Sequence, residues 1–72
     1  RAGSTAACTM NGANEVAVAA FLDHKCGYLD IVRTIEYALE RAENYLNPTL
    51  EHYVAADLES RRLAREFLKI KD

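Results

Sequence analysis

Residues 11–22 read NGANEVAVAAFL, and this stretch decides the fold. Every residue from Val16 to Leu22 is Val, Ala, Phe or Leu. At about 100° per residue, side chains in such a run surround a helix on all sides. The run is much shorter than the roughly 20 apolar residues that cross a bilayer. We therefore predict a helix that is enclosed by protein on every side.

The same helix extends toward the N-terminus, and the alanine-rich sequence favours helix from Thr5 to His24. Gly12 lies inside it and costs up to about 1 kcal/mol relative to alanine, which indicates a close neighbour. Gly3 and Ser4 are typical of a glycine that closes one helix and a serine that caps the next. We therefore expect a preceding helix that this chain does not contain, and a chain that is a fragment of a longer protein.

Two further helical segments follow. Residues 25–27 should end the first helix, with Gly27 as a left-handed cap. Tyr28 and Leu29 should form a short extended link, and Asp30 should cap the second helix. Pro48 ends that helix region because it disfavours helical backbone at the preceding residue. The predicted buried stripe of the second helix consists of Ile31, Ile35, Leu39 and Ala42.

The third helical region should begin at Thr49, with Leu50, Tyr53 and Val54 on one face. Continuing that face would turn Asp57 and Arg61 inward, so we predict a break near Ala56. Asp57 would then cap a last helix that buries Leu63, Ala64, Phe67 and Leu68. The fold class is therefore all-α, a small bundle of three to four helices in which residues 1–72 form one domain.

The composition excludes several kinds of partner. The 72 residues are 50% hydrophobic and 28% charged, with a net charge of −2, so neither nucleic acid nor a membrane is expected to bind. Cys8 and Cys26 would lie roughly 25 Å apart along one helix, too far for a disulfide. We expect both to be reduced thiols, which favours a cytoplasmic location.

Asn11, Asn14 and Glu15 are the first candidate site, because spacings of three and four place them together on the helix. They could bind a ligand or metal, or they could form a structural polar cluster that hydrogen-bonds to neighbouring segments. We favour the structural role, since one carboxylate without a second acid, histidine or serine is a poor catalytic set. No catalytic, cofactor-binding or metal-binding residue is predicted in this segment.

Two other groups are weaker candidates. His24, Cys26 and His52 lack the number and spacing of ligands that zinc requires. Arg61, Arg65 and Lys69 form a basic row, with Arg62 and Lys71 beside it. It could contact phosphates, but Glu59 and Glu66 dilute its charge, and a solvated helix face is the better interpretation.

The first 31 residues, RAGSTAACTMNGANEVAVAAFLDHKCGYLDI, resemble the C-terminal region of the 1-deoxy-D-xylulose 5-phosphate reductoisomerases. That family carries an Asn-x-Ala-Asn-Glu run, matched here from Asn11 to Glu15, and then an apolar run like Val16–Leu22. An aromatic residue and an Asp-Ile pair follow, matched by Tyr28, Asp30 and Ile31. Residues 54–64 resemble the family's last helix. The departures are Gly12, where alanine is more frequent, Ser4, where a second glycine is common, and Tyr28, where phenylalanine is common.

The resemblance implies that the chain is the C-terminal helical domain of a larger α/β enzyme. Such an enzyme makes 2-C-methyl-D-erythritol 4-phosphate with NADPH and Mg²⁺ or Mn²⁺, in non-mevalonate isoprenoid biosynthesis. Neither its nucleotide nor its metal motifs match this chain. The expected partner is the rest of the parent enzyme or a second copy of this chain.

Two alternatives stay open. The first is an independent helical interaction module that binds a partner helix through exposed apolar surface. The second is a small helix-turn-helix DNA binder, which the basic row suggests and the net charge opposes.

Overall fold

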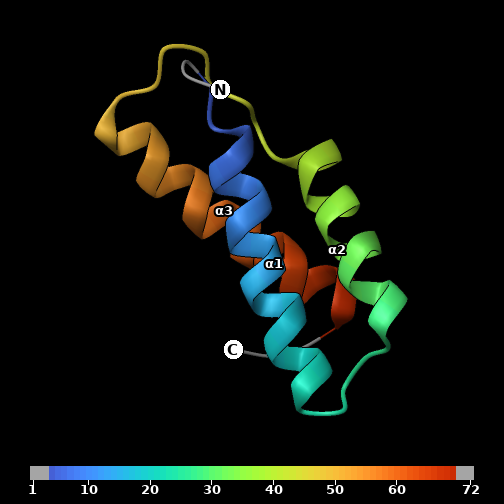
Figure 1. Cartoon of the computed structure of the whole chain (residues 1–72). Coiled ribbons are helices and arrows are strands. Elements are labelled where there is room, and N and C mark those ends of the chain that lie inside the picture. The colour runs from blue at the N-terminus through green and yellow to red at the C-terminus, as the bar shows by residue number, and fades with distance from the viewer. Residues whose placement is uncertain (1–3, 70–72) are drawn as a thin grey trace.

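The computed structural model describes residues 4–69 and contains three helices: α1 (Ala6–Leu22), α2 (Tyr28–Arg41) and α3 (Leu50–Leu68). No strand occurs among these residues, so the predicted all-α bundle is confirmed. In Figure 1, α1 lies in front of α3 and has α2 beside it. Each helix packs against the other two, and α1 is the element that both α2 and α3 contact most.

The N-terminal end of α1 is held to the loop between α2 and α3. Ser4 forms an isolated antiparallel bridge with Leu46. Thr5 is fully buried, and its hydroxyl accepts a hydrogen bond from the backbone N–H of Tyr45 at 3.0 Å. The backbone N–H of Thr5 donates to Asn44 Oδ1 at 3.2 Å. Thr5 occupies the N-cap position predicted for Ser4, and Gly3 lies outside the described residues.

The connection between α1 and α2 lies earlier in the chain than predicted. His24, with a φ of 60°, is the left-handed residue after α1, whereas Gly27 has a φ of −89° and is the N-cap of α2. The extended link at Tyr28 and Leu29 was wrong, since α2 begins at Tyr28. Asp30 lies in the first turn of the helix, where its carboxylate accepts from the Gly27 N–H at 2.9 Å. It therefore caps α2 from within rather than from the N-cap position.

The buried side of α2 is made of small side chains. Thr34 and Ala38 are fully buried, and the Thr34 hydroxyl donates to the Asp30 carbonyl at 2.6 Å. The predicted stripe is turned partly away: Ile31, Ile35 and Ala42 are half-buried and Leu39 is exposed. Small residues at the contact let the α2 and α1 backbones approach closely, so the larger aliphatic side chains lie at its margins.

Helix α3 is continuous from Leu50 to Leu68, and the predicted break near Ala56 was wrong. Thr49 is its N-cap, with the Thr49 hydroxyl accepting from the His52 N–H at 3.3 Å. Its buried residues are Ala56, Ser60, Leu63 and Ala64, which recur at the spacing of a single uninterrupted helix. Asp57 is therefore inside the helix and not a cap. The residues at the start of the helix that share a face, Leu50, Tyr53 and Val54, are exposed.

The central cluster of the bundle joins all three helices through Ala13, Ala38, Leu63 and Ala64. Val16, Ile35, Tyr37 and Ala42 pack against this cluster and are only partly buried. Three of the four central residues are alanines, so the core has little volume and little apolar area. The bundle therefore has a close-packed but thin interior.

Candidate interaction surface

Helix α1 turns a strip of small residues toward its two neighbours. The buried residues of this inner face are Thr9, Gly12, Ala13, Ala17 and Ala20. Ala13 and Ala17 are 0% exposed. None of these side chains is larger than threonine, which brings the backbones of α2 and α3 close to α1.

Gly12 marks the closest approach between α1 and α3. A Cβ atom at this position would lie 2.1 Å from Ser60 Oγ and 3.3 Å from Ser60 Cβ. The Ser60 hydroxyl occupies that space and donates to the Asp57 carbonyl at 2.8 Å. The close neighbour that Gly12 indicated in the sequence is therefore Ser60.

Glu15 connects α1 to α3 through an ion pair. Arg61 Nη2 donates to Glu15 Oε1 at 2.6 Å, while Arg61 Nε lies 3.1 Å from Asp57 Oδ1. These hydrogen bonds, first that with Glu15 and then those with Asp57, raise the pKa of the Arg61 guanidinium above its usual range. Asp57 and Arg61 are half-buried at the edge of the contact between α1 and α3. Their charges therefore remain near water although α3 has no break. The one-turn spacing of Asp57 and Arg61 was the sequence signal for their pairing.

The opposite side of α1 has Glu15 at its edge, directed toward α3, and is otherwise uncharged. We call it the outer face, and it consists of Met10, Asn11, Asn14, Val18 and Leu22. Val18 is half-buried and the others are exposed, with Leu22 70% and Met10 44% exposed. Neither carboxamide has a hydrogen-bond partner among residues 4–69. Of the predicted polar cluster, Glu15 thus joins α3, while Asn11 and Asn14 face outward.

The apolar run from Val16 to Leu22 is enclosed on one side only. Ala17 and Ala20 are buried, but Ala19 and Leu22 are exposed. Leu22, Tyr28 and Leu29 form further exposed apolar surface at this end of the bundle. The described residues therefore leave part of this helix uncovered, although its apolar sequence predicts that protein covers every side of it.

The C-terminal half of α3 differs because its exposed side is ionic, whereas Leu50, Val54 and Leu58 are exposed in the N-terminal half. Arg62 bonds Glu59 at 2.8 Å and Glu66 at 3.0 Å, and the Tyr37 hydroxyl of α2 also donates to Glu66. The hydrogen bond from Arg62 lowers the pKa of Glu59, and the hydrogen bonds from Tyr37 and then Arg62 lower that of Glu66. The predicted basic row is therefore interrupted by paired acids at Arg61 and Arg62, and Lys71 lies outside the described residues.

The histidines and cysteines are dispersed. Within the described part of the chain, no three His, Cys, Asp or Glu side chains are grouped so as to hold a metal ion. His52 stacks on Tyr45 with ring centroids 4.2 Å apart, and its Nδ1 accepts from the Thr49 N–H at 3.1 Å. Cys8 and Cys26 are both free, and burial raises the pKa of each thiol. These residues do not fit a metal centre or a reactive thiol.

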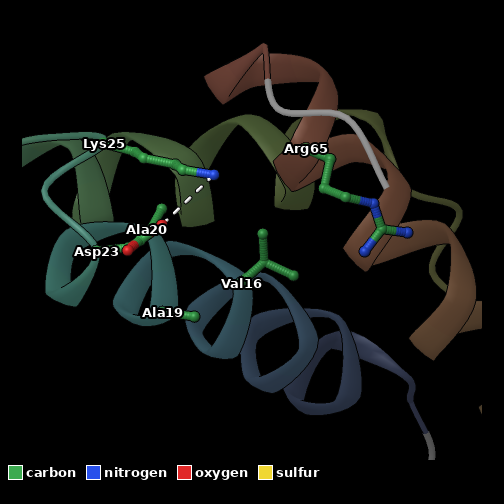
Figure 2. Close-up of a pocket in the computed structure, with 6 residues that line it drawn as sticks. All are labelled: Val16, Ala19, Ala20, Asp23, Lys25 and Arg65. Carbon is green, nitrogen blue, oxygen red and sulfur yellow. Dashed lines mark ion pairs between the residues drawn. The ribbon is translucent and has the colours of Figure 1, made fainter.

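A hollow lies near the C-terminal end of α1. It is lined by Val16, Ala19, Ala20, Asp23, Lys25 and Arg65. Lys25 pairs with Asp23 at 3.4 Å, and the Arg65 guanidinium points away from Lys25 across the Val16 side chain (Figure 2). The two cations therefore do not converge on one point where an anion would bind.

None of the helices in residues 4–69 combines the length and the apolar character that a bilayer span requires.

The fold and its surface define a class: a helical bundle domain whose central helix has one face open for packing. The family model for the DXP reductoisomerase C-terminal domain matches residues 1–63. The chain belongs to this family.

Three relatives show the similarity, all named 1-deoxy-D-xylulose 5-phosphate reductoisomerase. The chain is 44% identical to the protein of Caldanaerobacter subterraneus subsp. tengcongensis, over 93% of the chain and 18% of the relative. It is 43% identical to that of Chlorobaculum tepidum, over 94% of the chain and 18% of the relative. For Burkholderia multivorans the identity is 42%, over 92% of the chain and 17% of the relative. The chain thus spans less than a fifth of these relatives, and no solved structure matches it.

Proposed function

We propose that this chain is the C-terminal domain of a 1-deoxy-D-xylulose 5-phosphate reductoisomerase, in which it has a structural role. The identity to the named relatives over more than nine-tenths of the chain carries this proposal. The parent enzyme would convert 1-deoxy-D-xylulose 5-phosphate to 2-C-methyl-D-erythritol 4-phosphate with NADPH and Mg²⁺ or Mn²⁺, in the cytoplasm. The rest of that polypeptide, or a second copy, would be the partner of this domain, and neither nucleic acid nor a membrane would take part.

The chemistry would then belong to other parts of the polypeptide. NADPH would supply the hydride and the divalent ion would polarise substrate oxygens, but residues 4–69 contain no group that fits the metal. What this chain would contribute is a rigid body: the small-residue contact at Gly12 and Ser60 and the ion pair between Glu15 and Arg61 fix α1 on α3. Those residues would position the outer face of α1 for the remainder of the enzyme.

The test is an assay of the full-length protein that carries this chain. Purified full-length protein should oxidise NADPH when given 1-deoxy-D-xylulose 5-phosphate and Mg²⁺, and the 72-residue chain alone should not. Full-length protein that is folded, by circular dichroism, but produces no 2-C-methyl-D-erythritol 4-phosphate would refute the proposal. An equal rate from the 72-residue chain would refute its structural role.

An independent interaction module is the second candidate, and the uncharged outer face of α1 favours it. A module of this kind would bind an amphipathic helix of another protein. It differs from the first proposal in one measurable respect: its binding surface stays accessible in the full-length protein, whereas a domain docked on its parent has that surface covered.

A further inference from the structure

Asn11 and Gly12 form the one asparagine–glycine pair of the sequence. In such a pair the backbone nitrogen of the glycine can attack the side-chain amide of the asparagine, because glycine has no Cβ to hinder the approach. Asn11 is exposed, and its carboxamide has no hydrogen-bond partner among the described residues. The other three asparagines precede Glu15, Tyr45 and Pro48, where a Cβ hinders the attack. Asn11 is therefore the asparagine at which this reaction is chemically favoured.

The packing of α1 on α3 requires this glycine. A Cβ atom at position 12 would lie 2.1 Å from Ser60 Oγ. Ser60 is fully buried, and its hydroxyl is held in that place by the hydrogen bond to the Asp57 carbonyl. The contact between the helices therefore keeps beside Asn11 the residue that makes its amide most reactive.

We propose that Asn11 is a site of spontaneous deamidation, and that the folded N-terminal half of α1 controls the rate. The Gly12 nitrogen loses its proton to base and forms a bond to Asn11 Cγ. The bond from Cγ to the amide nitrogen breaks, and this nitrogen leaves as ammonia with the proton. Water then opens the five-membered succinimide at either carbonyl, which gives aspartate or isoaspartate. Water is the only reactant besides the chain, and nothing is oxidised or reduced.

Helical backbone prevents the attack in the native state. Position 12 lies within the continuous helix α1, where a backbone N–H donates to a carbonyl one turn earlier. Helical dihedral angles also hold the Gly12 nitrogen away from the Asn11 side-chain carbon. The reaction therefore requires that the first two turns of α1 open.

Thr5 holds these first turns closed. It is fully buried, its hydroxyl accepts from the Tyr45 N–H at 3.0 Å, and its own N–H donates to Asn44 Oδ1 at 3.2 Å. These bonds join the start of α1 to the loop between α2 and α3. Opening the first turns breaks them, so Thr5 protects an amide that it does not contact.

The two products differ in what they do to the helix. Isoaspartate carries the main chain through the side-chain methylene and lengthens the backbone between positions 11 and 12. The regular hydrogen bonds of α1 cannot continue across that point, where Gly12 meets Ser60. Aspartate adds only a charge at an exposed position. A chain that forms isoaspartate while α1 is open therefore loses the close contact between α1 and α3.

Peptide mass spectrometry of the full-length protein measures the reaction. The protein is incubated at mildly alkaline pH, native and in urea, and conversion at Asn11 is followed beside that at Asn14, which precedes glutamate in the same helix. We expect conversion at Asn11 to be at least about tenfold slower in the native state than in urea. In urea, Asn14 should convert much more slowly than Asn11.

Two threonine variants test the role of the first turns. Thr5→Ala removes the acceptor for the Tyr45 N–H and should raise the native rate at Asn11 about threefold or more. Thr34→Ala is the matched control, because Thr34 is equally buried but its hydroxyl bonds within α2. It should raise the rate less.

Three outcomes would overturn the proposal. The first is a native rate at Asn11 within about threefold of the rate in urea. The second is equal conversion of Asn11 and Asn14 in urea, which would remove the role of Gly12. The third is equal acceleration by Thr5→Ala and Thr34→Ala, which would assign the opening to the whole bundle.

Refolding separates the effect of isoaspartate from that of charge. Chains aged in urea are refolded, and those with isoaspartate should melt at a lower temperature than the variant Asn11→Asp, which carries the same charge. Equal melting temperatures would refute the loss of the contact between α1 and α3.

Discussion

Helices α1 and α3 meet through similar surfaces but turn different surfaces outward. On the inside, Ala13 and Ala17 of α1 and Ala64 of α3 are all fully buried. On the outside, α3 has the ion pairs of Arg62, whereas α1 has no charged side chain beyond Glu15. The difference teaches that burial inside this chain does not distinguish the two helices. Their outward sides do: that of α3 is ionic in its C-terminal half, although Leu50, Val54 and Leu58 are exposed in its N-terminal half.

The largest expected effect is a charge on the inner face of α1. Ala17→Asp would bury a carboxylate without a partner and should destabilise the chain by about 3 kcal/mol or more, enough to unfold much of so small a domain. Asn14→Asp, on the outer face of the same helix, should change the unfolding free energy by less than about 0.5 kcal/mol. Urea unfolding followed by circular dichroism measures both. Equal effects would erase the distinction between the two faces.

The contact between Gly12 and Ser60 gives an intermediate effect. Gly12→Ala gains helix propensity, but its Cβ would meet Ser60 Oγ at 2.1 Å, so the hydroxyl must rotate and lose its bond to Asp57. We expect a net loss of about 1 kcal/mol. Adding Ser60→Gly moves the side chain from one helix to the other and should recover most of the loss, with a coupling of at least about 1 kcal/mol in a double-mutant cycle. Additive effects would show that the helices do not touch there.

The ion pair between Glu15 and Arg61 should matter less. The side chains are 64% and 32% exposed, so solvent screens the pair, and Glu15→Gln should cost about 0.5 kcal/mol or less. The difference in unfolding free energy between the wild type and Glu15→Gln should shrink in 1 M NaCl. Under the proposed function, Glu15→Gln in the full-length protein should lower the melting temperature and change the turnover little. A large fall in turnover at an unchanged melting temperature would indicate that Glu15 acts in the chemical step and not in stability.

The smallest effect concerns the outer side of α3 and its response to acid. The pKa values of Glu59 and Glu66 are lowered in the folded chain by Arg62 and Tyr37. Their contribution to stability is therefore present above the unfolded glutamate pKa, about 4.3, and is lost as pH falls through the lower folded values. Arg62→Gln should flatten the dependence of the melting temperature on pH below that point, and Tyr37→Phe should flatten it through Glu66 alone. Wild-type pH profiles in both variants would contradict these pairings.

Much of the fold could be predicted because periodicity and turn residues are local. Helix α1 was expected at Thr5–His24 and spans Ala6–Leu22, and Gly12 correctly indicated a close neighbour. The face of α2 was not predictable from its apolar stripe. Burial there favours Thr34 and Ala38, since a close helix crossing admits small side chains and places Ile35 and Leu39 at its edge. Which side chains of α2 are buried depends on where α1 lies, and the sequence of α2 alone does not specify this.

The candidate surface was half predictable for the same reason. The spacing of Asn11, Asn14 and Glu15 placed them on one side of α1. The partner of Glu15 was missed because Arg61 was expected to lie beyond a break at Ala56, and the angle at which α3 crosses α1 decides that Arg61 reaches Glu15. Local spacing identifies which residues share a helix face, but the packing of helices decides which of them meet.

The room that Gly12 leaves for Ser60 also constrains how the two positions can change over generations. Alanine, which the resemblance expects at position 12, does not fit beside the Ser60 hydroxyl as it is placed here. A lineage that moved from alanine to this pair would therefore pass most easily through glycine at position 12 first, with serine arriving at position 60 afterwards. In the reverse order, alanine at position 12 would clash with a new serine at position 60. We therefore expect the two substitutions to occur together, with the change at position 12 first.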